Sequence, residues 1–220
     1  MSNGPGPSGV NKRVARGEAT RARILRSATA LFAKSGYEAS SIEAVLAKAG
    51  ISRGALYHHF ADKEALFEAV LETVEARIAA AIVGASKGIA DPVEALRAGC
   101  GAWLDLSRDR AVGRIVLIDA PAVLGWQKWR EIDARFGFGL LKVSLRRAAA
   151  MGRISENLVE MLSHVFLASL MEIALVIARA ADAERAMREG RDAVEALIGK
   201  LLGPPPRKRG NLERRATPMA

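Results

Sequence analysis

The sequence predicts an all-α protein of about nine helices, and three observations support this class. Apolar residues recur at three- and four-residue spacing along most of the chain, which is the spacing of one helix face. Alanine is abundant, whereas aromatic residues make up only 5% of the 220 residues. The alternating pattern of a half-buried β-strand is nearly absent. A chain of this length can hold one or two domains with a substantial core.

The first helix is expected from about Glu18 to Ser35. The preceding residues 1–16 are rich in Gly, Pro and Ser, and we predict that they form a disordered arm. Gly36 follows the helix and ends it. One face of the helix is apolar through Ile24, Leu25, Ala28, Leu31 and Phe32.

Residues 41–60 have the pattern of two short helices joined by a tight turn. The first helix is predicted to start with a capping box, in which Ser40 and Glu43 satisfy each other's backbone amides. Gly50 supplies the backbone freedom of the turn, and Ser52 can cap the second helix, Arg53–His59. The apolar stripe of the first helix is Ile42, Val45, Leu46 and Ala49.

The second of these helices carries a face suited to a polyanion. Leu56 and Phe60 lie one turn apart and are expected to face inward. The opposite side then presents a cation, a phenol and two imidazoles, with no carboxylate. The residues on this outward side are Arg53, Gly54, Ala55, Tyr57, His58 and His59.

A long helix is predicted from its N-cap Asp62 to about Ser86. At 1.5 Å per residue, its roughly 25 residues would span about 37 Å. Its first half can pack on the helix-turn-helix unit and its second half on the remaining chain, so one rigid element would join two domains. We expect these domains at residues 17–63, extending into the long helix to about residue 78, and at 64–203.

Five further helices are expected in the second domain. Ser155 is the expected cap of the fourth. Three prolines then stop regular structure, and we predict that the basic segment 204–220 is disordered. The expected ranges are Pro92–Ser107, Val112–Ile118 (broken by Pro121), Gln127–Met151, Glu156–Ala181 and Ala183–Leu202.

The charge of the chain is unevenly distributed. The total is +9, of which residues 1–63 contribute +6, residues 64–203 contribute −1 and residues 204–220 contribute +4. The basic excess therefore lies on the helix-turn-helix region and on the C-terminal segment. This asymmetry favours phosphate binding by one end of the molecule.

The sequence offers no sign of a disulfide, a signal peptide or a membrane span. Cys100 is the only cysteine and is expected to be a buried thiol. The N-terminus has no apolar signal region. The apolar stretch Leu158–Ala178 is interrupted by Glu160, His164 and Glu172, which predicts a buried helix and no membrane span.

Metal and catalytic sites are not predicted either. His58 and His59 are adjacent, so their side chains diverge on a helix, and no third ligand lies nearby. We find no nucleophile–base pair, metal cluster or phosphate loop, so we expect neither an enzyme nor a bound cofactor.

The strings SGYEASSIEAV and GISRGALYHHFADKEALFEAVL closely resemble the DNA-binding domain of the tetracycline-repressor (TetR) family of bacterial transcription regulators. The resemblance covers about Thr20 to Val74. One departure is Leu46, where the family usually has a small alanine. The resemblance implies an N-terminal helix-turn-helix DNA-binding domain and a C-terminal helical domain for effector binding and dimerisation.

The resemblance also implies roles for the outward side chains. Arg53 would read a base, since a guanidinium matches guanine O6 and N7. Lys63 corresponds to the phosphate-binding lysine of the family. The predicted DNA contacts are Ser41, Ser52, Arg53, Gly54, Ala55, Tyr57, His58, His59 and Lys63. A symmetric dimer would place two recognition helices on a palindromic operator.

The C-terminal body of the family encloses a pocket for a small effector. Its aromatic and apolar residues predict a mostly apolar effector, with Asp119, Arg114, His164 or Glu172 as polar groups. The candidate pocket residues are Trp103, Leu106, Ile115, Asp119, Trp126, Trp129, Phe136, Phe138, His164, Phe166 and Glu172.

Family members pair through their last two long helices. Here these helices carry more apolar surface than one bundle needs, which predicts a two-fold seam. The predicted interface residues are Leu158, Leu162, Val165, Ser169, Ile173, Val176, Val194, Leu197, Ile198 and Leu201.

We therefore expect a cytoplasmic, nucleoid-associated homodimeric repressor that binds double-stranded operator DNA and is released by a small-molecule effector. Two alternatives remain at this point. An activator or a low-specificity nucleoid-binding protein would share the fold, and the basic C-terminal segment is compatible with it. An α-helical enzyme lacks a recognisable catalytic constellation.

Overall fold

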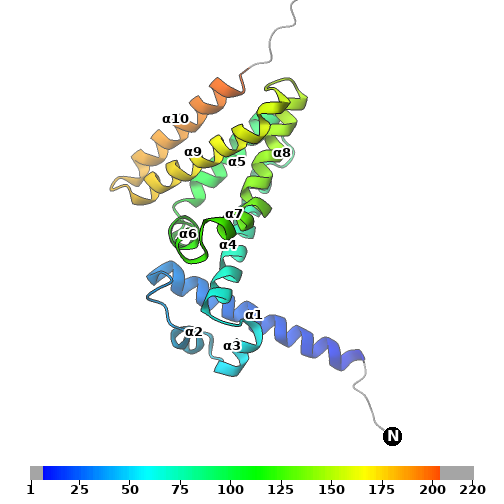
Figure 1. The fold of residues 1–220 in the computed structure, drawn as a ribbon, viewed down its shortest axis with the longest axis vertical. Helices are drawn as coiled ribbons and strands as arrows, with labels where there is room; N and C mark the ends of the chain where they lie inside the picture. The colour runs from blue at the N-terminus through cyan, green and yellow to red at the C-terminus, as the bar shows by residue number, and fades with distance from the viewer. Residues whose placement is uncertain (1–6, 204–220) are drawn as a thin grey trace, which may run out of the picture.

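The computed structural model describes residues 7–203, and helices are the only regular secondary structure in this part of the chain (Figure 1). The all-α prediction is confirmed. Segment η1 is a π-helix and η2 is a 3₁₀ turn. The elements in chain order are α1 (Pro7–Ser35), α2 (Ile42–Ala49), α3 (Arg53–His59), α4 (Lys63–Ser86), α5 (Pro92–Leu106), η1 (Val112–Asp119), α6 (Ala120–Leu124), α7 (Trp126–Arg135), α8 (Gly137–Ala150), η2 (Glu156–Leu158), α9 (Val159–Arg179) and α10 (Ala183–Leu201).

Helix α1 begins much earlier than expected. It starts at Pro7 and not near Glu18, so most of the segment predicted to be a disordered arm is helical. A proline is well tolerated at the first helical position, because the amide that it lacks would have no helical partner there. Gly17 inside the helix lowers its stability without breaking it. Residues 1–6 and the predicted disordered segment 204–220 lie outside the described residues.

Short polar side chains fix the starts of α2, α3 and α4. The hydroxyl of Ser41 accepts from the amide of Ala44 at 3.1 Å, so Ser41 is the N-cap of α2. The predicted capping box of Ser40 and Glu43 is therefore wrong by one position. Ser40 is buried instead, and its hydroxyl donates to the carbonyl of Gly36 at 2.7 Å. The caps of α3 and α4 are Ser52 and Asp62, as predicted.

One continuous core joins the helix-turn-helix unit to the body. It contains the rings of Phe32 and Phe67, whose centroids are 5.4 Å apart, and it runs from α1–α4 into η1, α6, α7 and α9. Helix α4 supplies buried residues along most of its length, from Leu66 to Ile78. The core therefore crosses the expected domain boundary at residues 63 and 64. Figure 1 shows α4 rising from α3 into the middle of the upper helices.

A second core holds the outer helices α5, α8, α9 and α10 together. Phe166 is fully buried in it. Two residues that the sequence assigned to a dimer seam, Val194 and Ile198, are also buried here, at 4% and 0% exposure. The assignment of these two residues was wrong, because their side chains pack inside the chain and offer no surface to a partner.

Three helix boundaries in the body differ from the prediction. The helix expected over Gln127–Met151 is broken at Phe136, which has φ −119° and ψ −98°. A Cβ on Gly139 would lie 2.9 Å from the carbonyl oxygen of Ala134, so the close approach of α7 and α8 needs glycine there. Pro121 does not end a helix but lies in the first turn of α6. Ser155 makes no side-chain cap, and α9 begins after η2.

Helix α9 leaves an apolar stripe on the outside of the chain. Among the described residues, the stretch Glu156–Arg179 is long and apolar enough to cross a membrane by length and composition alone. We predicted a buried helix, yet only 28% of its most apolar window is buried. The exposed stripe consists of Leu158, Met161, Val165 and Val176, which are 45–64% exposed.

Glycine 190 sets how closely α10 approaches α9. A Cβ at this position would lie 2.9 Å from Cγ2 of Ile173 and 3.0 Å from Cδ1 of Ile177. We therefore expect Gly190→Ala to lower the free energy of unfolding by about 1–3 kcal/mol, because overpacking must push the two helices apart.

Gly199→Ala on the same helix is the matched control, since nothing lies within 4 Å of its Cβ position. It should be neutral or stabilising by up to about 1 kcal/mol through helix propensity. Urea unfolding of both variants at one protein concentration checks this contrast. Equal effects of the two substitutions would refute the packing role of Gly190.

Candidate DNA-binding surface and internal cavity

The turn between α2 and α3 aims the start of α3 outward. Gly50 adopts the left-handed conformation, with φ 61° and ψ 47°, and the amide of Ile51 donates to the carbonyl of Leu46. Ser52 then caps α3 by accepting from the amide of Ala55 at 3.3 Å. Leu56 is fully buried and anchors the helix, as its spacing predicted.

The remaining side of α3 is accessible, which agrees with the predicted outward face. Arg53 and Tyr57 are exposed, and the guanidinium of Arg53 lies 5.9 Å from the centre of the Tyr57 ring. Arg53 also forms an ion pair with Glu43 of α2. A hydrogen bond from its own backbone amide lowers the pKa of Glu43 most, and the pairing with Arg53 lowers it further. Both partners are exposed, so the pair is weak and can be exchanged for another anion.

The two histidines occupy different environments. His58 is exposed, whereas His59 is half-buried, and their ring centroids are 5.2 Å apart. Burial lowers the pKa of His59, and the neighbouring His58 and Arg21 lower it further. Its imidazole is therefore neutral at pH 7. In residues 7–203, no three His, Cys, Asp or Glu side chains gather as metal ligands would.

Lys63 is the first residue of α4, next to the N-cap Asp62. Its ammonium lies 4.0 Å from the centre of the Tyr37 ring. The free amides at the start of this long helix attract an anion, and the lysine adds a full charge at the same place.

Asp119 forms a joint between this unit and the body. Its carboxylate accepts from the amide of Tyr37 at 2.8 Å and pairs with Arg114 at 3.0 Å. The guanidinium of Arg114 occupies the space that a side chain on Gly36 would need. The sequence placed Asp119 in the effector pocket, but its carboxylate instead holds the end of α1 against η1.

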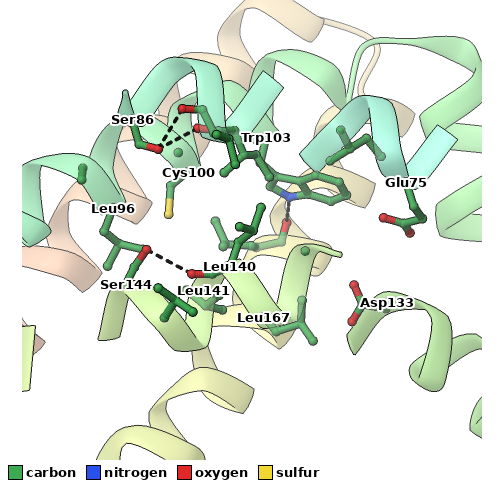
Figure 2. Close-up of a pocket in the computed structure, with 18 of the residues that line it drawn as sticks. Glu75, Ser86, Leu96, Cys100, Trp103, Asp133, Leu140, Leu141, Ser144 and Leu167 are labelled. Atoms are coloured by element: carbon green, nitrogen blue, oxygen red, sulfur yellow. Dashed lines mark hydrogen bonds between the residues drawn. The ribbon is translucent and has the colours of Figure 1, made fainter. Parts of the chain in front are cut away.

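A cavity of about 180 Å³ lies between the helices of the body (Figure 2), and the exposed Val83 and Val143 are part of its wall, so it is open to solvent on that side. Residues of α4, α5, α7, α8 and α9 line it, together with Val116 of η1. Most of the wall is apolar, and Trp103 closes one side, held by its Nε1, which donates to the carbonyl of Leu170 at 3.1 Å. Cys100 is also in the wall, and burial raises the pKa of its thiol to about 12, so the thiol stays protonated.

Two acidic side chains point into this cavity. Figure 2 shows the carboxyl groups of Glu75 and Asp133 facing one another beside Trp103. Glu75 is 3% exposed and Asp133 is 6% exposed. Burial raises the pKa of Glu75 to about 8, with a further contribution from Asp133. Burial also raises the pKa of Asp133 to about 6, against the opposing effect of Arg130, which pairs with it at 2.9 Å.

The structure brings few of the predicted pocket residues to this cavity. Trp103 lines it, whereas Leu106, Ile115, Trp129 and Phe136 belong to or pack against the first core. Phe166 lies in the second core, and Phe138 is buried with its ring 4.8 Å from that of His164. Trp126 is 69% exposed, and His164 and Glu172 are on the exposed face of α9. Large apolar side chains pack into the cores, because the free energy gained on burial grows with the apolar area removed from water.

The sequence analysis did not select Glu75 or Asp133, although each interrupts the apolar face of its helix. Glu75 interrupts the apolar face of α4 between Leu71 and Ile78 at helical spacing. Asp133 does the same in α7, four residues after Trp129. A carboxyl on the apolar face of a helix is rare in cores and points to a special environment.

Comparison with known proteins identifies the fold and the family. Residues 24–70 match the family model "Bacterial regulatory proteins, tetR family", and residues 93–201 match "Tetracyclin repressor-like, C-terminal domain". The HTH-type transcriptional regulator UidR of Escherichia coli (strain K12) is 44% identical over 52 residues, which is 24% of this chain and about a quarter (26%) of UidR. The repressor AcnR of Corynebacterium efficiens is 26% identical over 70% of this chain and 78% of AcnR.

A solved structure extends the similarity to nearly the full length. A TetR-family transcriptional regulator from Pectobacterium atrosepticum is 32% identical, with a TM-score of 0.72, and the match covers 87% of this chain and 98% of that one. Together with the two family models, it confirms the resemblance seen in the sequence. The chain belongs to the tetracycline-repressor (TetR) family of DNA-binding transcription regulators.

Proposed function

We propose that this chain is a ligand-responsive repressor, which binds a palindromic operator as a homodimer and leaves it when a small, mostly apolar effector fills the cavity. One observation carries the proposal: α4 begins at Lys63 on the DNA-binding side and lines the cavity with Glu75, Ile78 and Ile82. A ligand that shifts α4 would therefore shift the DNA-binding unit. The related AcnR is named a repressor, and repression in the cytoplasm is the output that we propose here.

The DNA contacts follow from exposure and chemistry. Arg53 would exchange its weak pair with Glu43 for a guanine edge, and the small Gly54 and Ala55 would let the backbone approach the groove. Tyr57, His58 and the phosphate-binding Lys63 would contact the backbone of the operator, with His59 at the edge of the contact. Ser41 and Ser52 accept from amides as caps, so their hydroxyl hydrogens stay available for phosphate oxygens.

Asp119 is the proposed second route from the body to the DNA-binding unit. It connects η1, which contributes Val116 to the cavity wall, with the amide of Tyr37. The ring of Tyr37 lies under the ammonium of Lys63. A movement of η1 would thus reach the phosphate-binding lysine through two short contacts. We infer that this joint carries part of the ligand response.

The exposed stripe of α9 is the proposed dimer seam. Leu158, Val165 and Val176 remain exposed, and Leu162, Ser169 and Ile173 are half-buried beside them. From α10, the half-buried Leu197 and Leu201 complete the surface. A second copy would bury this stripe in a four-helix arrangement. Glu160, His164 and Glu172 lie on the same face and disfavour contact with lipid.

We expect Lys63→Ala to reduce the salt dependence of operator binding. Each phosphate contact contributes about one unit to the slope of log Kd against log salt, so the loss of one contact should lower the slope by about one. The measurement is fluorescence anisotropy with labelled DNA over a salt series. Lys87→Ala, at the other end of α4, should keep the wild-type slope. An unchanged slope in Lys63→Ala would remove that residue from the contact.

Selection of bound sequences from a random DNA library tests the repressor proposal and the role of Arg53. The wild-type protein should enrich a palindrome with half-sites about 34–36 Å apart. Arg53→Ala should cost about 1–3 kcal/mol and relax one base position in each half-site. A uniform loss for all sequences would make Arg53 a phosphate contact. Binding without any enriched motif would favour a low-specificity nucleoid-binding protein.

We expect Val165→Glu to dissociate the dimer, because it places a charge in the middle of the apolar seam. Analytical ultracentrifugation should show a monomer, with helical content retained by circular dichroism. Val14→Glu is the control, since Val14 is 55% exposed and the N-terminal half of α1 lies well away from α9 in Figure 1. A Val165→Glu protein with the mass of the wild type would place the seam elsewhere.

A further inference from the structure

Within residues 7–203, the acidic end of the cavity holds two acidic side chains but only one basic partner. Asp133 is paired with Arg130, but no hydrogen bond or ion pair reaches the carboxyl of Glu75 from the described residues. Glu75 is nevertheless 97% removed from solvent, because its exposure is 3%, and its carboxyl points into the cavity (Figure 2). The two carboxyls and one guanidinium leave a single negative charge without a partner when both acids are ionised.

An unpaired buried carboxyl is costly for the fold. Removing a charge from water without a partner is strongly unfavourable, and the group remains protonated to avoid that cost. Leucine at this position would fill a similar space on α4 without such a penalty. The acid at this position therefore points to a partner that enters the cavity from outside the chain.

The other polar groups of the wall are already engaged. The hydroxyl of Ser86 donates to the carbonyl of Ile82 at 3.0 Å, and that of Ser144 donates to the carbonyl of Leu140 at 3.1 Å. Arg147 is exposed and its guanidinium donates to the carbonyl of Ala90 at 3.5 Å. None of them is as deeply buried without a partner as Glu75 is, so Glu75 is the polar group of the wall that is left for a ligand.

We propose that the cavity binds a small organic cation, a protonated amine or a quaternary ammonium with an apolar body, whose charged group lies between Glu75 and Asp133. The indole of Trp103 stands beside the two carboxyls and adds an aromatic surface that favours a cation. Leu140, Leu141 and Leu167 offer the apolar wall for the rest of the ligand. This inference rests on the proposed function, because it names the class of the effector.

Binding of a cation should release a proton from the protein. At pH 7 the Glu75 carboxyl is mostly protonated, since its pKa is about 8 in the empty cavity, and a nearby positive charge would lower that pKa. Asp133, with a pKa of about 6 and Arg130 beside it, is largely ionised at this pH, and the Cys100 thiol in the wall stays neutral. A permanently charged ligand should therefore bind more tightly as the pH rises from 6 to 9.

Three probes of one shape separate the effect of charge from that of size. Benzyltrimethylammonium carries a permanent positive charge, 2-methyl-1-phenyl-2-propanol is its neutral counterpart, and 2,2-dimethyl-3-phenylpropanoate is the anion. Isothermal titration calorimetry with the full chain should rank the cation at least tenfold tighter than the other two. Titration at pH 7 in buffers of different ionisation enthalpy should show release of close to one proton.

Glu75→Gln should lower the affinity for the cation at least tenfold, abolish the proton release and leave the affinity for the alcohol unchanged. The control is Glu72→Gln on the same helix, because Glu72 pairs with Arg135 at the surface. This control variant should change the affinity for each probe by less than twofold. The pH dependence of cation binding by the wild-type protein tests the same proposal without any variant. This test remains available even if Glu75→Gln folds poorly.

Four outcomes would overturn the inference: no binding of the cation, equal or tighter binding of the alcohol or the carboxylate, an undiminished affinity in Glu75→Gln, or a flat pH profile. Operator binding measured with each probe distinguishes this failure from that of the proposed function. A cation that binds through Glu75 without affecting operator affinity would confirm the cation site and refute the ligand response. Operator release by the alcohol or the carboxylate alone would support the response and refute the cation site.

Discussion

The packing of α4 into both halves of the molecule is the constraint on which the rest depends. Its buried residues from Leu66 to Ile78 belong to one apolar core, which begins in α1 and ends in α7 and α9. Tightly packed interiors transmit displacements, because side chains cannot shift singly without opening voids. The DNA-binding unit is therefore not a separate module on a flexible linker. Its position is determined by the same contacts that stabilise the body.

Function and stability make opposing demands on the cavity. A well-filled core would have placed an aliphatic residue at position 75, where the apolar face of α4 meets the cavity. The glutamate there weakens the fold and gives the cavity a chemical preference. The pairing of Asp133 with Arg130 reduces the cost at the second acid, although burial still raises the pKa of Asp133 to about 6. Such a local loss of stability is characteristic of binding sites in otherwise regular structures.

Local chemistry explains why the helix-turn-helix was predictable and the cavity was not. Ser52, Asp62 and Gly50 have their expected caps and turn, because each acts on amides a few residues away. The aromatic residues offered as pocket walls have the same periodicity whether they line a cavity or fill a core, and Trp129 and Phe166 fill cores. Likewise, apolar spacing alone could not distinguish a dimer interface from the internal core in which Val194 and Ile198 are buried. These choices depend on how helices distant in sequence pack together.

Gly36 connects two requirements that are usually separate. Its backbone has φ +81°, which disfavours any side chain, and the guanidinium of Arg114 occupies the place where a Cβ would be. The arginine in turn holds Asp119 beside the end of α1. In the divergence of such proteins, positions 36 and 114 should therefore change together. A side chain at the first would displace the guanidinium at the second from beside Asp119, and the joint between the two halves would have to be rebuilt from other residues.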